Sequence, residues 1–233
     1  MGARSMTSLL LTLRKDHCDI PLSVAVRELV VAGWTGRDQA AVDAHISELR
    51  DLGVAPPRST PVFYRVSASL LTTAKCIQVI GFESSGEAEV VLTRDDRTLL
   101  VGLGSDQTDR KVETIGVAWS KQMCPKPLAA DLWDFSSVEP HWDELILRSY
   151  LVAGGERRLY QEGSVAALRH PGELMERYAG ASGLLPGVAM FCGTLPLIGG
   201  LRGSAEFAME LEDPVLKRSI KHSYAVDALP IEG

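Results

Sequence analysis

Two neighbouring runs, Glu87-Ala88-Glu89-Val90-Val91-Leu92 and Leu99-Leu100-Val101-Gly102-Leu103, have the texture of buried β-strands. Alternation along a strand places Glu87 and Glu89 on one face, with their Cα atoms roughly 6.5–7 Å apart. Two carboxylates on one face repel each other, so that face is either solvated or holds a cation. Ligands that are all oxygen favour Mg²⁺ or Mn²⁺ over zinc.

Short strand-like runs also dominate the rest of the chain, and two helices are expected among them. Apolar positions at helical spacing predict a helix over residues 38–52, and a later helix over 172–178 follows His170-Pro171. We therefore expect an α/β (α+β) fold in which an N-terminal α/β segment, residues 1–58, packs on a larger β body, residues 59–233. Further strands are predicted in these segments: 9–13, 23–32, 61–66, 75–81, 112–118, 164–168 and several within 186–226.

Composition is that of an ordinary folded protein: of 233 residues, 45% are hydrophobic and 23% charged, which excludes disorder over most of the chain. The 30 acidic residues outnumber the 24 basic ones, so nucleic acid and anionic membranes, which recruit clustered Lys and Arg, are not expected partners. No apolar run approaches the ~18 residues that a membrane-spanning helix needs. The four cysteines lie far apart without a C-x-x-C pair, which argues against a cysteine zinc site and favours a reduced, cytoplasmic compartment.

Three further groups of polar residues have both a functional and an ordinary structural explanation. The residues from Asp106 to Arg110 follow a strand end, where scaffolds place reactive groups, or they form a simple turn. Lys121 lies in an apolar, proline-containing segment, where an ammonium can neutralise an oxyanion, or it is exposed. His45 and Glu48 share one face of the predicted helix and form either a water-activating dyad or a surface pair.

A glycine-bracketed loop at residues 193–201 follows a run of apolar residues. Its backbone N–H groups and the Thr194 hydroxyl could cradle a carboxylate, or the loop is a hairpin turn. It lacks the phosphate-loop pattern, so nucleotide binding is not expected. His141 and His222 are weighed as substrate contacts against the more common structural role.

The order of these segments resembles the fumarylacetoacetate hydrolase superfamily over about residues 33–226, and in particular a bacterial branch of unassigned function. Departures from the family pattern are Asp38 for Asn, Arg65-Val66 for Lys-Pro and Lys111 for Asp. They put the substrate in question and leave the acidic residues intact. The matching elements, in family order, are Gly36-Arg37-Asp38, His45 with Glu48, residues 61–67, Glu87-Ala88-Glu89-Val90, Asp106 to Arg110, Lys121, residues 155–161 and Gly193-Thr194-Leu195-Pro196.

The resemblance implies a mixed β-roll, a homodimer and a metal-dependent enzyme. It implies that the substrate is a small molecule, a 2-oxo acid or a 1,3-dicarbonyl compound of the acylpyruvate type, whose C–C bond is hydrolysed. A lyase acting on a 2-oxo acid (a decarboxylase, hydratase or dehydratase) and a non-catalytic binding module are the alternatives. The implied roles are Mg²⁺ or Mn²⁺ ligation by Glu87, Glu89 and Asp106, oxo-group binding by Lys121, water activation by His45 and Glu48, and substrate binding by Arg110, Gln161, Gly193 and Thr194.

Overall fold

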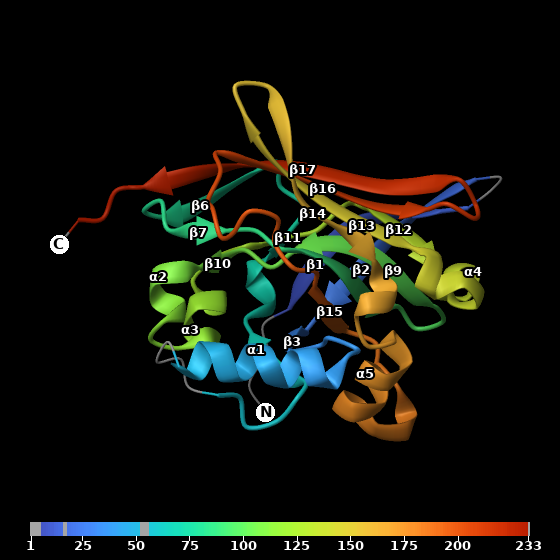
Figure 1. Cartoon of the computed structure of the whole chain (residues 1–233). Helices are drawn as coiled ribbons and strands as arrows, with labels where there is room; N and C mark the ends of the chain where they lie inside the picture. The colour runs from blue at the N-terminus through green and yellow to red at the C-terminus, as the bar shows by residue number, and fades with distance from the viewer. Residues whose placement is uncertain (1–5, 16–17, 52–55, 233) are drawn as a thin grey trace, which may run out of the picture.

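A computed structural model describes residues 6–15, 18–51 and 56–232 of the chain (Figure 1). Two sheets contain most of the strands. The larger sheet has eight strands in the order β2 (Asp19–Val26), β1 (Thr7–Arg14), β12 (Asp131–Asp134), β9 (Leu99–Ser105), β8 (Ala88–Arg94), β15 (Val188–Thr194), β3 (Glu28–Gly33) and β4 (Val62–Val66). The smaller sheet has five strands in the order β14 (Glu156–Ser164), β13 (Ile146–Ala153), β16 (Glu206–Asp213), β17 (Arg218–Leu229) and β6 (Cys76–Ile80).

Both sheets are mixed. In the larger one β1 runs parallel to β12 and β15 runs parallel to β3, whereas its other pairs are antiparallel. In the smaller one only β17 and β6 are parallel. Two short pairs complete the strands: β10 (Thr108–Asp109) with β7 (Ser84–Ser85), and β11 (Lys126–Pro127) with β5 (Leu71–Thr72). The predicted mixed α/β fold with a predominance of strands is confirmed.

The central strands β8 and β9 are buried on both faces, which explains their nearly continuous apolar sequences. One face of β8, through Val90 and Leu92, belongs to a core cluster that also contains Leu211 of the five-stranded sheet. The other face, through Val91, belongs to a second cluster that includes Leu11 of β1. The two acidic residues at the start of β8 therefore lie at the edge of the most deeply buried part of the fold.

The helices lie mainly on the side of the molecule opposite β16 and β17 (Figure 1). The predicted helix over 38–52 is α1 (Gln39–Asp51), and Asp38 caps it by accepting hydrogen bonds from the backbone N–H groups of Ala40 and Ala41. The predicted helix over 172–178 is α5 (Pro171–Ala179), and His170 caps it through Gly172 N–H. The 3₁₀ turns are Ala68–Leu70, Glu139–Glu144, Val165–Ala167 and Gly180–Ser182, and α4 is Phe135–Val138.

Two predicted strands are wrong. Residues 112–118 cover the end of α2 (Arg110–Glu113), a turn and the start of α3 (Val117–Gln122), and the Asp109 carboxylate caps α2 by accepting from Val112 N–H. In residues 164–168 the strand β14 ends at Ser164, whose hydroxyl accepts from Ala166 N–H and starts a 3₁₀ turn. In both places a side-chain cap satisfies a backbone N–H group locally and favours a helical turn over a strand.

The N-terminal strands β1 to β3 pair within the same sheet as β8, β9, β12 and β15. The boundary expected at residue 58 stays a prediction. Among the described residues, no helix is long and apolar enough to cross a membrane.

Candidate metal centre

The acidic cluster starts with Glu89 on β8, which is 2% exposed. Its Oε2 accepts a hydrogen bond of 2.7 Å from the backbone N–H of Gly193 on the neighbouring strand β15. Gly193 has a φ of +96°, and a Cβ atom there would lie 1.7 Å from Thr35 Oγ1. Only glycine fits, because the backbone must approach both Thr35 and the Glu89 carboxylate at this point.

Asp106 follows the last residue of β9 and is fully buried. Its backbone N–H donates to the carbonyl oxygen of Glu87 at 2.9 Å, which ties the end of β9 to the start of β8. Glu87, Glu89 and Asp106 each offer a carboxylate oxygen, and these oxygens lie within 4.8 Å of one another. The structure therefore brings together the three residues that the sequence predicted as metal ligands.

The electrostatics of the three carboxylates fit a divalent cation. Burial raises the pKa of Glu89 well above its ordinary value, and the negative charges of Asp106 and Glu87 act in the same direction. A bound cation would relieve both the repulsion and the cost of burying the charge. Because every ligand atom is a carboxylate oxygen, the donor set suits Mg²⁺ or Mn²⁺.

Two lysines contact the Asp106 carboxylate, one at each oxygen. Lys121, on α3, donates to Oδ2, and the Nζ atom of Lys126 lies 3.2 Å from Oδ1. Burial alone would raise the pKa of Asp106, but the two ammonium groups lower it to about 2. Burial alone would lower the pKa of Lys121, but Asp106 and Glu87 raise it above its ordinary value. Both partners are therefore charged near neutral pH.

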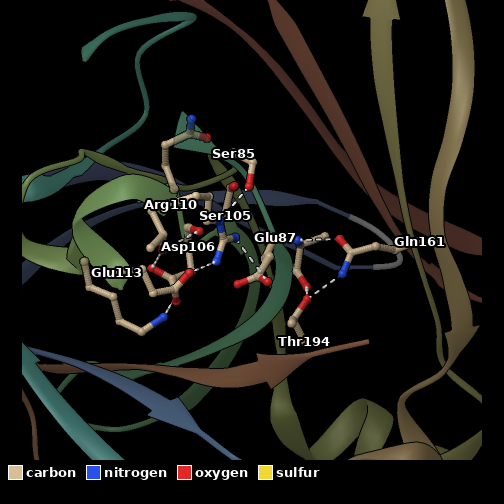
Figure 2. A network of polar contacts seen from close by, with 12 residues as sticks. Ser85, Glu87, Ser105, Asp106, Arg110, Glu113, Gln161 and Thr194 are labelled. Atoms are coloured by element: carbon tan, nitrogen blue, oxygen red, sulfur yellow. Dashed lines mark hydrogen bonds and ion pairs between the residues drawn. The ribbon is translucent and has the colours of Figure 1, made fainter. Parts of the chain in front are cut away.

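Arg110 connects Glu87 to the surrounding structure (Figure 2). Its Nη2 atom lies 3.1 Å from Glu87 Oε1, its Nε donates to Ser85 Oγ at 2.7 Å, and its Nη1 donates to Glu113 at 2.9 Å. Burial alone would lower the pKa of Arg110, but Glu87 and Glu113 raise it above its ordinary value. Arg110 therefore stays positively charged and holds Glu87 at the cluster.

Gln161 and Thr194, predicted to bind substrate, lie on the other side of Glu87 in Figure 2 and bond to each other. The Gln161 amide donates to Thr194 Oγ1 and to Leu195 O, each at 2.7 Å, and its oxygen accepts from Ala88 N–H and from Ser149. Thr194 in turn donates to Ala88 O at 2.8 Å. With its amide so engaged, Gln161 fixes the start of β8, and a direct contact with substrate stays a prediction.

The predicted dyad falls on α1, but the side chains of His45 and Glu48 lie outside the described residues, so their role stays a prediction. His141 bonds through Nε2 to Asp213 Oδ1 at 3.0 Å, in a separate cluster. His222 is buried, and burial together with the nearby Lys75 ammonium lowers its pKa to about 4. None of these contacts joins His141 or His222 to the acidic cluster.

Sequence reasoning missed Lys126 and Tyr224. The position of Lys126 between Pro125 and Pro127 in an apolar segment is a usable signal for a buried cation. Tyr224 reaches from β17 of the smaller sheet, and its hydroxyl contacts Ser105 at 2.7 Å and Gln107 at 2.8 Å, on either side of Asp106. No local pattern around Tyr224 indicates that long-range contact.

A family model described as "protein of unknown function (DUF2848)" matches residues 32–224. The chain belongs to this family. No curated protein matches it. The DUF2848 chain has the fold of solved fumarylacetoacetate hydrolase family proteins, over nearly its whole length, which confirms the resemblance seen in the sequence.

Three solved structures illustrate that likeness. A candidate fumarylpyruvate hydrolase from Burkholderia cenocepacia is 18% identical, with 96% of this chain and 97% of that chain covered and a TM-score of 0.61. A yeast fumarylacetoacetate hydrolase family protein is 18% identical, with coverages of 89% and 95% and a TM-score of 0.62. A 2-keto-3-deoxyarabinonate dehydratase is 14% identical, with coverages of 88% and 74% and a TM-score of 0.61. The fold is therefore common to proteins described as hydrolases and as dehydratases.

Proposed function

We propose that this DUF2848 chain is a divalent-metal-dependent hydrolase that cleaves a C–C bond in a 2-oxo acid or a 1,3-dicarbonyl compound of the acylpyruvate type. The observation that carries the proposal is the convergence of Glu87, Glu89 and Asp106, with Lys121 directly beside them. A cluster of three carboxylates with a neighbouring ammonium matches the chemistry of an enolate-forming reaction, in which negative charge develops on a substrate oxygen.

In this proposal the three carboxylates hold Mg²⁺ or Mn²⁺. The bound ion would supply Lewis-acid polarisation of a substrate carbonyl group. The protein's part is to keep the ligand oxygens together. Arg110 and Gly193 do so by binding Glu87 and Glu89, and the hydrogen bond from Asp106 N–H to Glu87 O holds the two strand ends in register.

Lys121 is the residue proposed to stabilise the enolate. Among the described residues its ammonium donates one hydrogen bond, to Asp106, and it lies 5.7 Å from the centre of the Tyr64 ring. Its remaining N–H groups are free to donate to a substrate oxygen. A preorganised donor of this kind accelerates a reaction by about 10²–10³.

For hydrolysis, we propose that His45 removes a proton from water and that Glu48 orients the imidazole and stabilises its protonated form. The oxygen of that water attacks the distal carbonyl carbon. The C–C bond then breaks, its electron pair passes to the enolate, and the proton taken up by His45 is returned to the enolate carbon to give the second acid. Activation of water by His45 and Glu48 is the step that distinguishes hydrolysis from the alternatives.

A lyase, such as a dehydratase of a sugar-derived 2-oxo acid, is the second candidate because a dehydratase shares this fold. It would use the same carboxylates and Lys121 without a water nucleophile. A non-catalytic binding module is the third candidate, and it predicts ligand binding without turnover. The partner proposed for all three is a small molecule, and we propose that the chain works as a homodimer.

Product analysis with an acylpyruvate and with a sugar-derived 2-oxo acid, each with Mg²⁺ or Mn²⁺, separates these functions. Hydrolysis gives two acids, whereas dehydration keeps the carbon skeleton whole. We expect His45→Ala to lower the hydrolytic rate by about 10²–10⁴ and His141→Ala, which alters a histidine bonded to Asp213, to leave it nearly unchanged. A His45→Ala protein with the wild-type rate would refute water activation by this residue.

The metal requirement is tested separately by calorimetry of chelator-treated protein. Glu89→Ala should abolish measurable Mg²⁺ binding, because it removes one of three ligands and opens the site. Undiminished Mg²⁺ affinity in Glu89→Ala would refute the metal centre. The oligomeric state is measured by light scattering during gel filtration, where a mass near that of one chain would refute the homodimer.

A further inference from the structure

Lys126 is a second buried lysine at the acidic cluster, and it differs from Lys121 in how it is held. It is 0% exposed, lies in β11 and is flanked by Pro125 and Pro127. Its Nζ atom donates to the backbone carbonyl oxygens of Gln107, Lys121 and Cys124. Three carbonyl acceptors match the three N–H groups of an ammonium, whereas a neutral amine has only two. Burial lowers the pKa of Lys126, but the adjacent Asp106 carboxylate opposes that shift, and the three acceptors hold the ammonium form in place.

The two lysines contact different oxygens of the Asp106 carboxylate. Lys126 lies at Oδ1, while Lys121 lies at Oδ2. Lys126 cannot leave without stripping three buried carbonyl groups of their donor, which is costly in a protein interior. Lys121 has a single described hydrogen-bond acceptor and can exchange it. Oδ2 is thus the oxygen that can be released to a cation, whereas Oδ1 lies beside the anchored ammonium of Lys126 and accepts a hydrogen bond of 3.3 Å from Thr108 Oγ1.

We propose that Lys126 is a positioning residue that fixes the orientation of Asp106 and, as an immobile positive charge, weakens divalent-cation binding at the cluster. The inference rests on the proposed metal centre. Its physical basis is like-charge repulsion over a few ångströms in a dry environment, where an interaction between unit charges is worth several-fold more than in water. Lys126 thus balances two effects: it keeps Asp106 ionised and in place, and it limits how tightly the ion is held.

Calorimetric titration of Mn²⁺ into the full-length, chelator-treated protein tests this role. Lys126→Met should bind Mn²⁺ about tenfold or more tightly than the wild type, because a buried charge beside a ligand is removed. Lys111→Met is the matched control: Lys111 is exposed, so removing its charge should change the affinity by no more than about twofold. A damaged fold weakens binding, so only relief of repulsion accounts for a gain.

Every outcome decides the proposal. A folded Lys126→Met protein with wild-type or weaker Mn²⁺ affinity would overturn it. If circular dichroism shows that Lys126→Met is unfolded without metal, Lys126→Gln, which removes the charge but keeps N–H donors for the carbonyl groups, is titrated in its place: a gain in Mn²⁺ affinity supports the proposal and wild-type or weaker affinity overturns it. Absence of Mn²⁺ binding in the wild type and in every variant would instead refute the metal centre itself, and this role with it.

Discussion

Asp106 and Asp213 are both fully buried carboxylates, yet they belong to different kinds of cluster. Asp213 accepts from the backbone N–H of Leu216 and pairs with His141 and Arg218, and among the described residues it belongs to no group of three metal-ligating side chains. Asp106 pairs with two lysines but also shares its site with Glu87 and Glu89. In the first cluster the carboxylate faces hydrogen-bond donors and a cation. In the second, three carboxylates have oxygens within 4.8 Å of one another.

The pKa shifts of the two aspartates do not tell these clusters apart. Burial alone would raise the pKa of Asp213, but Leu216 N–H, His141 and Arg218 lower it, just as the lysines lower the pKa of Asp106. What differs is Glu89, whose pKa is raised because burial and neighbouring carboxylates both oppose its charge. A buried carboxylate pushed towards the neutral form marks the functional candidate more sharply than one that is well paired.

The largest effect is expected for Asp106→Ala. This change leaves the buried ammonium groups of Lys121 and Lys126 without their counter-charge, so the free energy of unfolding should fall by about 3–5 kcal/mol. Urea denaturation monitored by circular dichroism measures it. A loss below about 1 kcal/mol would mean that the lysines find other partners and that the cluster is less tightly coupled than its geometry indicates.

Asp213→Ala should lower the free energy of unfolding by a smaller amount, about 2–3 kcal/mol, because His141 and Arg218 are partly exposed and can be solvated. Its Mn²⁺ affinity should stay within about twofold of the wild type, since independent sites act additively. The same calorimetric assay checks this. A tenfold loss of Mn²⁺ affinity would show that the two clusters are coupled, so that the Asp213 cluster could no longer be treated as independent of the metal centre.

Glu89→Gln tests the strained carboxylate directly. In chelator-treated protein near pH 8, we expect it to raise the free energy of unfolding by about 1 kcal/mol, because it removes a buried like charge while keeping an oxygen for Gly193 N–H. Mn²⁺ affinity should fall by about a hundredfold with the loss of an ionised ligand. Asp134→Asn, at the half-buried cap of α4, is a control for carboxylate-to-amide exchange.

The smallest expected effect is the pH dependence of the rise in the free energy of unfolding that Glu89→Gln causes. A carboxyl group whose pKa is raised in the folded state contributes stability below its unfolded pKa and loses that contribution as pH rises through the folded value. The advantage of Glu89→Gln should therefore shrink as the pH is lowered towards 4.5, the ordinary pKa of glutamate. Urea midpoints measured across this window report it, and an advantage independent of pH would contradict the assigned shift.

Part of the metal centre could be predicted because its residues lie at the ends of two strongly patterned strands. The alternation that places Glu87 and Glu89 on one face is a property of any extended backbone, and Asp106 follows the next strand along the chain. The run over residues 112–118 was mispredicted because its β-branched content suggested a strand, while the Asp109 cap made a helical turn locally satisfied. A side-chain cap and the β propensity of the residues favour different backbone conformations here, and composition alone does not show which of them prevails.

The sequence by itself determined the two central strands, the two longer helices with their caps and the order of the acidic residues, because these depend on periodicity and on contacts within a few positions. Only the tertiary structure decided that the three carboxylates meet, that Lys126 rather than Lys121 is the anchored cation, and that Tyr224 of the other sheet braces the turn around Asp106. Those contacts join residues far apart in the chain. They exist because the two sheets share one core cluster, and burial makes the state of each charged group there depend on the partners that the fold brings to it.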